Sequence, residues 1–495
     1  MLFSSSLFWY YIIMQAISPK NKVFGKNNFA GMKALVMGLG LNGGGLESAR
    51  FLAEKGAIVT VTDLRDENTL KPTIEKLKNY PIRYVLGKHE IEDFRDADFV
   101  VKNPAVKPDS PYLQAAKRIE TDISLFLASC PARLVAVTGS KGKSSVSSAI
   151  HFALKEGRVK GQTPRGRAWL GGNITISPLS FLDELREEDD VVLELSSWQL
   201  GDLKGRGLLK PRAAVITNIM RDHQDKYGSM EAYVDDKRVI YSGQDENDVT
   251  VAADDAWGRS FLSESRGRSV PYSAKPLDTP GGWLSDPQGP GLARLWEIPG
   301  NQADKGRVVE VVPAQPLIPG FHQKQNLLIA ALSLLDLGFD ADFIRESLAR
   351  FPGIEHRLEF FHESGGVKFY NDSAATIPEA AAAALSAFEK PPVLVTGGAD
   401  KELDFTPLAQ AAGKAKALVL LAGTGSVKLK TLLDSGGVKY KGPFDSLEAA
   451  INAAGEAAAP GDAVVLSPGC ASFGMFLNEF DRGRKWKEGV KRLFP

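Results

Sequence analysis

The chain has 495 residues, 43% of them apolar and 24% charged, and its 60 basic and 60 acidic side chains cancel to a formal charge of zero. Such a length exceeds what one hydrophobic core can organise, so we expect about two to four domains. A balanced charge does not suggest a strongly basic surface, and nucleic acid is not predicted as a partner. Cys130 and Cys470 have no metal-ligand spacing and are typical of a reducing compartment, which predicts a cytoplasmic protein.

Residues 1–31 are predicted to lie outside the fold as an N-terminal extension. Their apolar run, Leu7–Met14, is far shorter than the about 20 residues that a membrane-spanning helix needs, so membrane insertion is not predicted. No basic segment precedes this run and no small-residue cleavage site follows it, which argues against a secretory signal. Two origins are compatible with the segment: a native tail, or translation from an upstream start codon.

A first domain is predicted for residues 32–130, beginning with an apolar strand at Ala34–Met37. The turn Gly38–Gly43 follows, reading GLGLNG, and then a helix and a second strand that ends near Asp63, 20 residues after Gly43. This order resembles the dinucleotide-binding fingerprint, in which a Gly-rich turn approaches a diphosphate and an acidic residue binds a ribose. The diphosphate of a UDP-sugar would fit the same geometry, with Asp63 at the ribose or the base. Packing of the turn alone is the alternative role for these glycines.

The second predicted domain, residues 131–351, starts with a phosphate-binding loop. An apolar strand at Leu134–Val137 runs into TGSKGKSS, and a helical pattern follows. Backbone N–H groups of such a turn and helix N-terminus point at phosphate oxygens. Lys143 can reach the β- and γ-phosphates, and the hydroxyl of Ser144 can bind Mg²⁺. Two residues rather than the usual four separate the glycines of the turn, so a Gly-containing surface turn is the alternative.

Polar groups follow other predicted strands of this domain. Glu194 ends an apolar run, where a carboxylate suits Mg²⁺; capping of the next helix is its alternative role. His223 lies in a polar cluster after a strand at Ala213–Thr217, and Lys237 lies in a helical segment. Residues 259–316 are rich in glycine, proline and charge, and they are predicted to form a peripheral hairpin region.

Residues 352–495 are predicted to form a third domain of alternating strands and Ala-rich helices. This alternation is typical of a doubly wound parallel sheet, and loops beyond the carboxyl ends of such strands bind ligands. The predicted strands are Val367–Tyr370, Val393–Thr396, Ala417–Leu421 and Ala463–Leu466, and the polar loops are Asn371–Ser373, Gly397–Lys401 and Ser467–Phe473.

An ordered set of motifs resembles the Mur ligases over about residues 32–493. The motifs are GLGLNG, TGSKGKSS, GGNIT, LELSSWQL, ITNIMRDHQD, YVDDKRVIY, HRLE, YNDSAAT, GGADK and SPGCASF. GLGLNG, LELSSWQL and SPGCAS point to the branch of the family that adds D-glutamate. The resemblance implies three α/β domains: an N-terminal Rossmann-like domain for the UDP substrate, a central P-loop-type ATPase domain, and a C-terminal Rossmann-like domain for the amino acid.

The resemblance also implies the reaction, an ADP-forming acid–amino-acid ligation in the synthesis of a peptidoglycan precursor. ATP would phosphorylate the carboxylate of UDP-N-acetylmuramoyl-L-alanine, and the amine of D-glutamate would attack the acyl phosphate. The implied cofactors are ATP and two Mg²⁺ ions, with a carbamate on Lys237, and a monomer is expected. The residue types agree with this chemistry, because positioning and charge neutralisation carry most of phosphoryl transfer.

Site residues follow from matching the family motifs to this sequence position by position. The implied catalytic residues are Lys143, Glu194, His223 and Lys237. The implied magnesium ligands are Ser144, Glu194, His223 and the carbamylated Lys237. The implied ATP contacts are Gly139, Ser140, Lys141, Gly142, Lys143, Ser144, Ser145, Asn326, His356, Arg357 and Asp372. The implied contacts of the UDP substrate are Leu41, Asn42, Asp63 and Asn173, and those of D-glutamate are Thr376, Lys401, Ser472 and Phe473.

Several positions depart from the family pattern. Those near the amino-acid and ATP motifs are Ala374 for a usual lysine, Gln323 for an asparagine, and Glu479-Phe480 for an aromatic-then-Glu order. Those in the first domain are Ser124 for an acidic residue, and Asn103 and Ala105 for the serine and glycine of a turn. These differences concern recognition of D-glutamate and uridine.

Three other functions compete with this hypothesis. One is another Mur-type or folylpolyglutamate-type amide ligase with a different acceptor. The second is an NAD-dependent oxidoreductase, suggested by the first Gly-rich turn, which leaves the phosphate loop and the third domain unexplained. The third is an inactive nucleotide-binding protein, suggested by Ala374.

Overall fold

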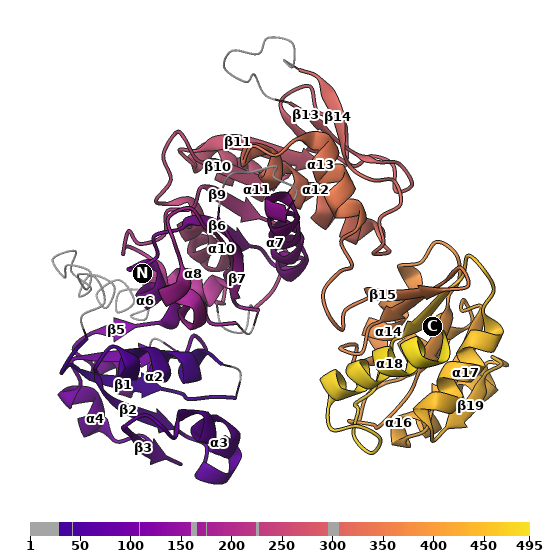
Figure 1. Cartoon of the computed structure of the whole chain (residues 1–495), viewed down its shortest axis with the longest axis horizontal. Helices are drawn as coiled ribbons and strands as arrows, with labels where there is room; N and C mark the ends of the chain where they lie inside the picture. Colours follow the sequence, from indigo (N-terminus) through magenta and orange to yellow (C-terminus); the bar gives the residue numbers. More distant parts are fainter. Residues whose placement is uncertain are drawn as a thin grey trace, which may run out of the picture. The chain divides into compact units, whose positions relative to one another are not determined.

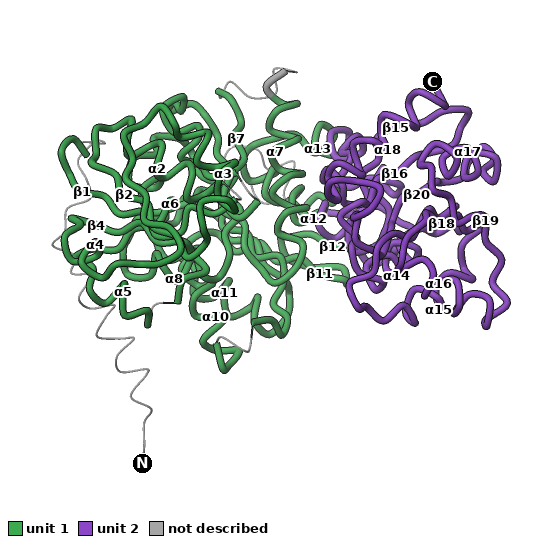
Figure 2. Tube along the Cα trace, turned by 90° about the horizontal axis from the view of Figure 1, so that it is seen from below, with its two compact units in different colours: residues 1–283, 293–309, 329–344 green, residues 284–292, 310–328, 345–495 purple. Residues whose placement is uncertain are grey.

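The structure of the protein is a computed structural model that describes residues 29–41, 43–107, 109–159, 166–174, 176–223, 227–295 and 306–495. The chain divides into two compact units (Figure 2). Unit 1 contains residues 1–283, 293–309 and 329–344, and unit 2 contains residues 284–292, 310–328 and 345–495. The predicted substrate contact Asn42 and residues 1–28 of the predicted extension lie outside the described part of the chain.

The first sheet has five parallel strands in the order β3-β2-β1-β4-β5 (Figure 1). Its strands are β1 (Lys33–Met37), β2 (Ile58–Asp63), β3 (Ile82–Leu86), β4 (Phe99–Lys102) and β5 (Ile119–Glu120). Its helices are α2 (Gly44–Glu54), α3 (Glu67–Ile74), η2 (Glu75–Leu77), α4 (Ile91–Asp96), α5 (Pro111–Gln114) and α6 (Asp122–Leu127). The strand order reverses between β1 and β4, so the turns that follow these two strands lie at the switch point where such sheets bind ligands.

The fold begins before residue 32, where the first domain was predicted to start. Phe29 is only 2% exposed, and its ring centroid lies 5.9 Å from that of Phe51 and 5.8 Å from that of Phe99. The prediction that residues 1–31 stand outside the fold is therefore wrong for Phe29, because an apolar ring in a polar stretch joins the core.

The second sheet has nine strands in the order β14-β13-β12-β11-β10-β9-β6-β8-β7. Its strands are β6 (Arg133–Thr138), β7 (Ala168–Gly172), β8 (Asp190–Glu194), β9 (Ala213–Ile216), β10 (Val249–Ala253), β11 (Arg268–Ser273), β12 (Gly281–Trp283), β13 (Gly291–Arg294) and β14 (Val308–Val312). The helices of this part are α7 (Lys143–Val159), η3 (Pro178–Glu184), α8 (Ser197–Leu203), α10 (Met230–Arg238), η4 (Val239–Tyr241), α11 (Ala256–Glu264), α12 (Phe321–Asp336) and α13 (Ala341–Ala349).

Residues 259–316 do more than form the predicted peripheral hairpin. The strand β11 pairs in parallel with β10, and β12 pairs in parallel with β11, so this stretch extends the central sheet. Some of the glycines and prolines that suggested a hairpin region lie within these strands, as Pro271 does in β11 and Gly282 in β12.

The third sheet has six strands in the order β15-β16-β20-β17-β18-β19, with β15 antiparallel to β16 and the other neighbours parallel. Its strands are β15 (Glu359–Ser364), β16 (Val367–Asn371), β17 (Val393–Thr396), β18 (Ala417–Leu421), β19 (Lys441–Phe444) and β20 (Ala463–Leu466). Its helices are α14 (Pro378–Ser386), α15 (Thr406–Ala412), α16 (Thr424–Ser435), α17 (Leu447–Ala457) and α18 (Glu479–Leu493). With one sheet for each predicted domain, the three-domain α/β fold class is confirmed.

Inside unit 1 a single hydrophobic core joins the first sheet to the central sheet. Phe126 of α6 and Phe181 of η3 meet in it, with ring centroids 6.0 Å apart. In unit 2, separate clusters cover the two faces of the third sheet. Among the described helices, none combines the length and the apolar character that crossing a membrane requires.

Candidate active site

The loop between β6 and α7 is held in shape by glycine and by the segment that follows β9. Gly139 has φ +140°, and a Cβ there would lie 2.0 Å from Oγ1 of Thr217, so no other residue fits. The backbone N–H of Ser140 donates to the carbonyl of Asn218 at 2.9 Å, and that of Lys141 donates to Oδ1 of Asn218 at 2.9 Å. The loop ends at the N-terminus of α7, where free backbone N–H groups favour an anion.

Two lysine side chains converge on this loop. Nζ of Lys143 donates to the carbonyls of Gly139 and Ser140, both at 3.0 Å, and Nζ of Lys237 donates to the same Gly139 carbonyl at 3.0 Å. Burial lowers the pKa of Lys143. Lys237 is 1% exposed, and burial, followed by the charge of Lys143, lowers its pKa to about 7. The structure therefore brings two basic side chains to the start of this loop.

Glu194, at the carboxyl end of β8, lies next to this loop along the same edge of the sheet. It is 2% exposed, and its Oε1 accepts a hydrogen bond from Nδ2 of Asn173 at 3.0 Å. Among the described residues, no hydrogen-bond donor reaches its other oxygen, Oε2. A buried carboxylate oxygen without a donor is costly and suits a hard cation such as Mg²⁺.

Aromatic residues surround the predicted metal ligand His223. Its ring centroid lies 5.3 Å from that of Trp198 and 6.2 Å from that of Tyr233. The hydroxyl of Tyr233 lies 3.0 Å from Oγ of Ser140, and Nζ of Lys237 lies 4.6 Å from the centroid of its ring. Unit 1 thus brings His223, Lys237 and the phosphate loop around one aromatic side chain.

The Gly-rich turn after β1 is closed by Asp63. Its Oδ2 accepts from the backbone N–H of Gly40 at 3.1 Å, and its Oδ1 accepts from that of Arg65 at 3.0 Å. Leu41, in the same turn, is 52% exposed. Asp63 therefore holds the turn itself, a role that the sequence did not reveal.

A small cavity opens at the switch point of the first sheet. Its lining residues are Val36, Met37, Gly38, Gly44, Gly45, Ser48, Val101, Lys102, Asn103, Pro104 and Asp122. Oδ1 of Asn103 accepts from the backbone N–H of Ala105 at 3.0 Å, so this departure from the family pattern makes an Asx turn. At Ser124, which stands in place of an acidic residue of the family pattern, the hydroxyl donates to the carboxylate of Glu120.

The predicted nucleotide residues of unit 2 meet at the ends of β16 and β20. Asp372 accepts from Oγ of Ser467 at 2.6 Å and from the backbone N–H of Leu358 at 3.1 Å. Burial raises its pKa to about 6. Arg357 is the residue directly before Leu358, and its charge opposes that rise in the pKa of Asp372.

His356 is held as a neutral ring. Nδ2 of Asn371 lies 2.8 Å from Nδ1 of His356, and the same amide donates to Oε2 of Glu359 at 3.0 Å. The amide nitrogen can only donate, so Nδ1 accepts and the ring proton sits on Nε2. Burial lowers the pKa of His356, which agrees with this state.

The predicted nucleotide contact Asn326 lies on α12. Its Nδ2 donates to Oε1 of Gln323 at 3.1 Å. Gln323 is one of the departures from the family pattern, and its longer amide reaches Asn326 one helical turn away.

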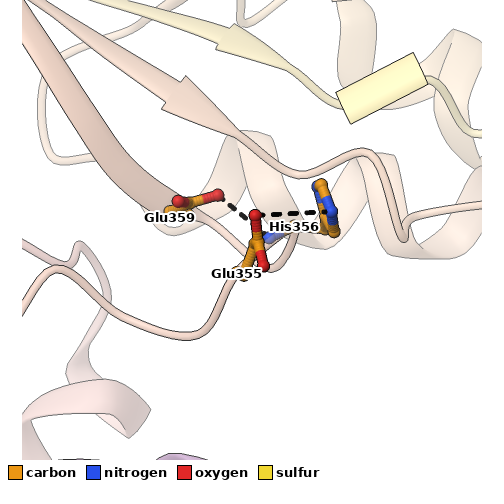
Figure 3. A group of neighbouring side chains, drawn as sticks. All are labelled: Glu355, His356 and Glu359. Carbon is orange, nitrogen blue, oxygen red and sulfur yellow. Dashed lines mark hydrogen bonds and ion pairs between the residues drawn. The ribbon is translucent and has the colours of Figure 1, made fainter. Parts of the chain in front are cut away.

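The side chains of Glu355, His356 and Glu359 face one another at the start of β15 (Figure 3). Such a group could hold a metal ion, but Nζ of Lys487 lies 2.9 Å from Oε1 of Glu355 and 2.8 Å from Oε1 of Glu359. The ammonium group of Lys487 thus already bridges the two carboxylates and offsets part of their charge. Sequence reasoning missed this cluster because Lys487 lies far along the chain.

The loops expected to hold D-glutamate are tied together in unit 2. Ala399 and Ala471 exchange backbone hydrogen bonds, both 3.0 Å long, and so join the loop of Lys401 to that of Ser472. Nζ of Lys401 lies 5.4 Å from the ring centroid of Phe473, which is 60% exposed. The loop of Thr376 is joined to these loops through the N–H of Gly469, which donates to the carbonyl of Ala375 at 2.9 Å.

Three family descriptions match the chain. "Mur ligase MurD-like, N-terminal domain" matches residues 32–124, "Mur ligase middle domain" residues 137–284, and "Mur ligase, glutamate ligase domain" residues 356–470.

Curated relatives match over nearly their whole length. The UDP-N-acetylmuramoylalanine--D-glutamate ligase of Treponema pallidum (strain Nichols) is 41% identical, covering 94% of this chain and 98% of the relative. The protein of the same name from Roseiflexus sp. (strain RS-1) is 42% identical, covering 93% of this chain and 99% of the relative.

Among solved structures, the UDP-N-acetylmuramate-alanine ligase MurC of Thermotoga maritima has a TM-score of 0.53 at 21% identity, covering 93% of this chain and all (100%) of that chain. At this sequence identity, the similarity is evidence for a shared fold only.

Fold and matches together define an ATP-dependent amide ligase built of three α/β domains. The chain belongs to the Mur ligase family. This membership favours a ligase over the NAD-dependent oxidoreductase that the first Gly-rich turn had also suggested.

Proposed function

We propose that the chain catalyses the ATP-dependent ligation of D-glutamate to UDP-N-acetylmuramoyl-L-alanine, a step of peptidoglycan precursor synthesis. Relatives that carry this activity in their name match over nearly the whole chain. The observation in the structure that carries the proposal is the convergence of Lys143 and Lys237 on the Gly139 carbonyl, beside a Glu194 oxygen that lacks a donor.

The proposed chemistry begins with activation of a carboxylate. A carboxylate oxygen of UDP-N-acetylmuramoyl-L-alanine attacks the γ-phosphorus of ATP, and ADP leaves with the bridging oxygen. The amine of D-glutamate then attacks the acyl carbon, loses a proton, and displaces inorganic phosphate. Lys143 stabilises the charge on the transferring phosphoryl group, since preorganised cations act most strongly where charge develops.

Magnesium fits the residues at the phosphate loop. Ser144 and Glu194 would hold one ion, because the buried Oε2 of Glu194 has no donor among the described residues. His223 and a carbamate on Lys237 would hold a second. When bound, these ions neutralise the phosphate charges and align the attacking and leaving oxygens.

Lys237 is suited to carbamylation. It is 1% exposed, and its hydrogen-bond acceptors among the described residues are the Gly139 carbonyl at 3.0 Å and Oγ1 of Thr138 at 3.4 Å. A pKa of about 7 leaves much of the amine neutral at physiological pH. The neutral amine adds to the carbon of CO₂ and releases a proton, which converts a cation into an oxygen donor for Mg²⁺.

The nucleoside of ATP, D-glutamate and the UDP substrate are each assigned to one of the other groups of predicted site residues. Asn326, His356, Arg357 and Asp372 bind the nucleoside of ATP, with the Asp372 carboxylate as the acceptor for a ribose hydroxyl. Lys401 pairs with a carboxylate of D-glutamate, in the loop cluster with Thr376, Ser472 and Phe473. Leu41 and Asn42 in the turn after β1, together with Asp63 and Asn173, bind the UDP substrate.

An acceptor panel tests this function. The purified chain is incubated with ATP, Mg²⁺ and UDP-N-acetylmuramoyl-L-alanine, and each of D-glutamate, L-glutamate, L-alanine and a diamino acid is added separately. D-Glutamate alone should give a product heavier by one glutamate less one water in mass spectrometry. Turnover with another acceptor would favour the alternative ligases, and nucleotide binding without any product would favour the inactive protein.

A further inference from the structure

Lys102 is a buried cation at the ligand-binding edge of the first sheet. It ends β4, is 6% exposed, and directly precedes the turn 103–106, of which Asn103 and Pro104 line the cavity. Its Nζ lies 2.8 Å from Oδ2 of Asp202 and 3.3 Å from the carbonyl of Val106. One ammonium group therefore binds both the end of this turn and a carboxylate of the central domain.

Asp202 sits on the short helix α8, between two groups of the proposed catalytic centre. α8 begins three residues after Glu194, with Ser196 and Gln199 forming its capping box. Its Gly201 packs against Asp236 so closely that a Cβ would lie 2.6 Å from Oδ2, and Asp236 directly precedes Lys237. The position of α8 is thus tied to both groups.

A second buried ion pair crosses the same boundary without touching the cavity. Nη1 of Arg206 lies 2.6 Å from Oε2 of Glu120, with side chains 9% and 4% exposed. Glu120 is also paired with Arg118 at 2.6 Å. The Arg206 contact provides a comparison for Lys102, because it joins the same parts of unit 1 through Glu120, which does not line the cavity.

A buried ion pair is a poor explanation for stability. Removing two charges from water costs about as much as their attraction returns, and apolar pairs of the same size often stabilise a protein equally well. The Lys102 pair differs in what it connects. Lys102 contacts the Val106 carbonyl at the end of the turn 103–106, and its partner Asp202 belongs to α8.

We propose that Lys102 and Asp202 are positioning residues. They fix the turn 103–106, at the nucleotide-sugar pocket, relative to the catalytic centre. This inference rests on the proposed function, in which the turn after β1 binds the UDP substrate; Gly38 of that turn lines the same cavity as Asn103 and Pro104. The pair orders the turn before the substrate arrives, so less ordering remains to be done on binding.

The test replaces the pair without leaving a buried charge. Lys102→Met/Asp202→Leu should fold and melt near the temperature of the unaltered protein, while the Kd for UDP-N-acetylmuramoyl-L-alanine, measured by calorimetry, rises roughly tenfold. The KM for ATP should not change. The single variant Asp202→Asn, which keeps the side-chain shape, should raise the same Kd by a smaller factor.

Arg206→Met is the matched control, because it leaves Glu120 paired with Arg118. It should lower the melting temperature and leave the Kd for the UDP substrate unchanged. An unchanged Kd in either Asp202 variant would overturn the inference, and so would an equal rise of this Kd in Arg206→Met. Turnover by the unaltered chain would still support the proposed function. No binding of the UDP substrate by the unaltered chain would overturn both.

Discussion

Lys143 and Lys237 share one hydrogen-bond acceptor, the carbonyl oxygen of Gly139, which each Nζ approaches at 3.0 Å. When both groups are protonated they repel each other, and the charge of Lys143 is the second cause, after burial, of the low pKa of Lys237. An anion bound at this loop would offset that repulsion.

Replacing Lys143 by alanine should abolish catalysis and leave the fold intact. The side chain is partly exposed, and it donates hydrogen bonds to the loop carbonyls of Gly139 and Ser140, so little packing should be lost. Loss of its charge at the transferring phosphoryl group should lower kcat by at least about 100-fold.

Lys155→Ala is the control for Lys143→Ala, since Lys155 is an exposed residue of the same helix, α7. Its kcat should equal that of the unaltered chain. Steady-state phosphate release together with thermal melting separates the two variants. A Lys143→Ala protein that retains normal kcat would remove this lysine from the mechanism.

Lys237 should carry a carbamate in the active protein. The unaltered chain, equilibrated with ¹³C-labelled bicarbonate, should show a carbamate resonance in its ¹³C spectrum, because the neutral amine is available in a buried site. Lys237→Ala should lose both this resonance and activity. Full activity in CO₂-free buffer, with a plain amine at Lys237, would rule out the carbamate.

Nucleotide binding should weaken below a pH of about 6, the value to which burial raises the pKa of Asp372. Above it the carboxylate is charged and accepts strongly from a ribose hydroxyl; as the pH falls through this value the group takes up a proton and becomes a weaker acceptor. Kd for ATP, measured by calorimetry between pH 5 and pH 8, should therefore fall as the pH rises (about one proton is involved).

Asp372→Asn serves as the control for this pH profile. It should bind ATP weakly at every pH and lose the dependence near pH 6, because the amide does not titrate. A profile that keeps its shape in this variant would assign the titration to another group.

Lys401→Met should weaken binding of D-glutamate. A charge-assisted hydrogen bond contributes about 1.5–3 kcal/mol, so the KM for D-glutamate should rise by one to two orders of magnitude. The KM for ATP and for the UDP substrate should stay constant. Lys430→Met, an exposed lysine on α16, is the control and should change none of these constants. A constant KM for D-glutamate in Lys401→Met would exclude Lys401 from this site.

The fold was most predictable where strands are fully buried. Val393–Thr396, Ala417–Leu421 and Ala463–Leu466 were predicted with the bounds that the structure gives. Strands covered on both faces read as continuous apolar runs between turn residues, which is a strong local signal.

Strands at the edge of the third sheet were missed. β15 pairs antiparallel to β16 with a register shift between Phe360 and His362, and β19 contains Gly442 and Pro443. Half-covered, irregular strands have no clear periodicity, so nothing in the local sequence distinguishes them from loops.

The site was predictable where local motifs place polar groups at strand ends, as at Glu194 and in the loop from Gly139 to Ser145. The ion pairs of Lys102 and Lys487 were not, since each joins residues about 100 or more positions apart. Which distant charges meet depends on tertiary packing, and a single sequence holds no record of that.

Transfer of oxygen from substrate to phosphate tests the central claim most directly. UDP-N-acetylmuramoyl-L-alanine labelled with ¹⁸O in its carboxylate is incubated with the chain, ATP, Mg²⁺ and D-glutamate, and the phosphate is examined by mass spectrometry. Activation by phosphorylation predicts that one ¹⁸O atom appears in the released inorganic phosphate for each amide bond formed. Phosphate without the label, or ¹⁸O recovered in AMP, would contradict the mechanism.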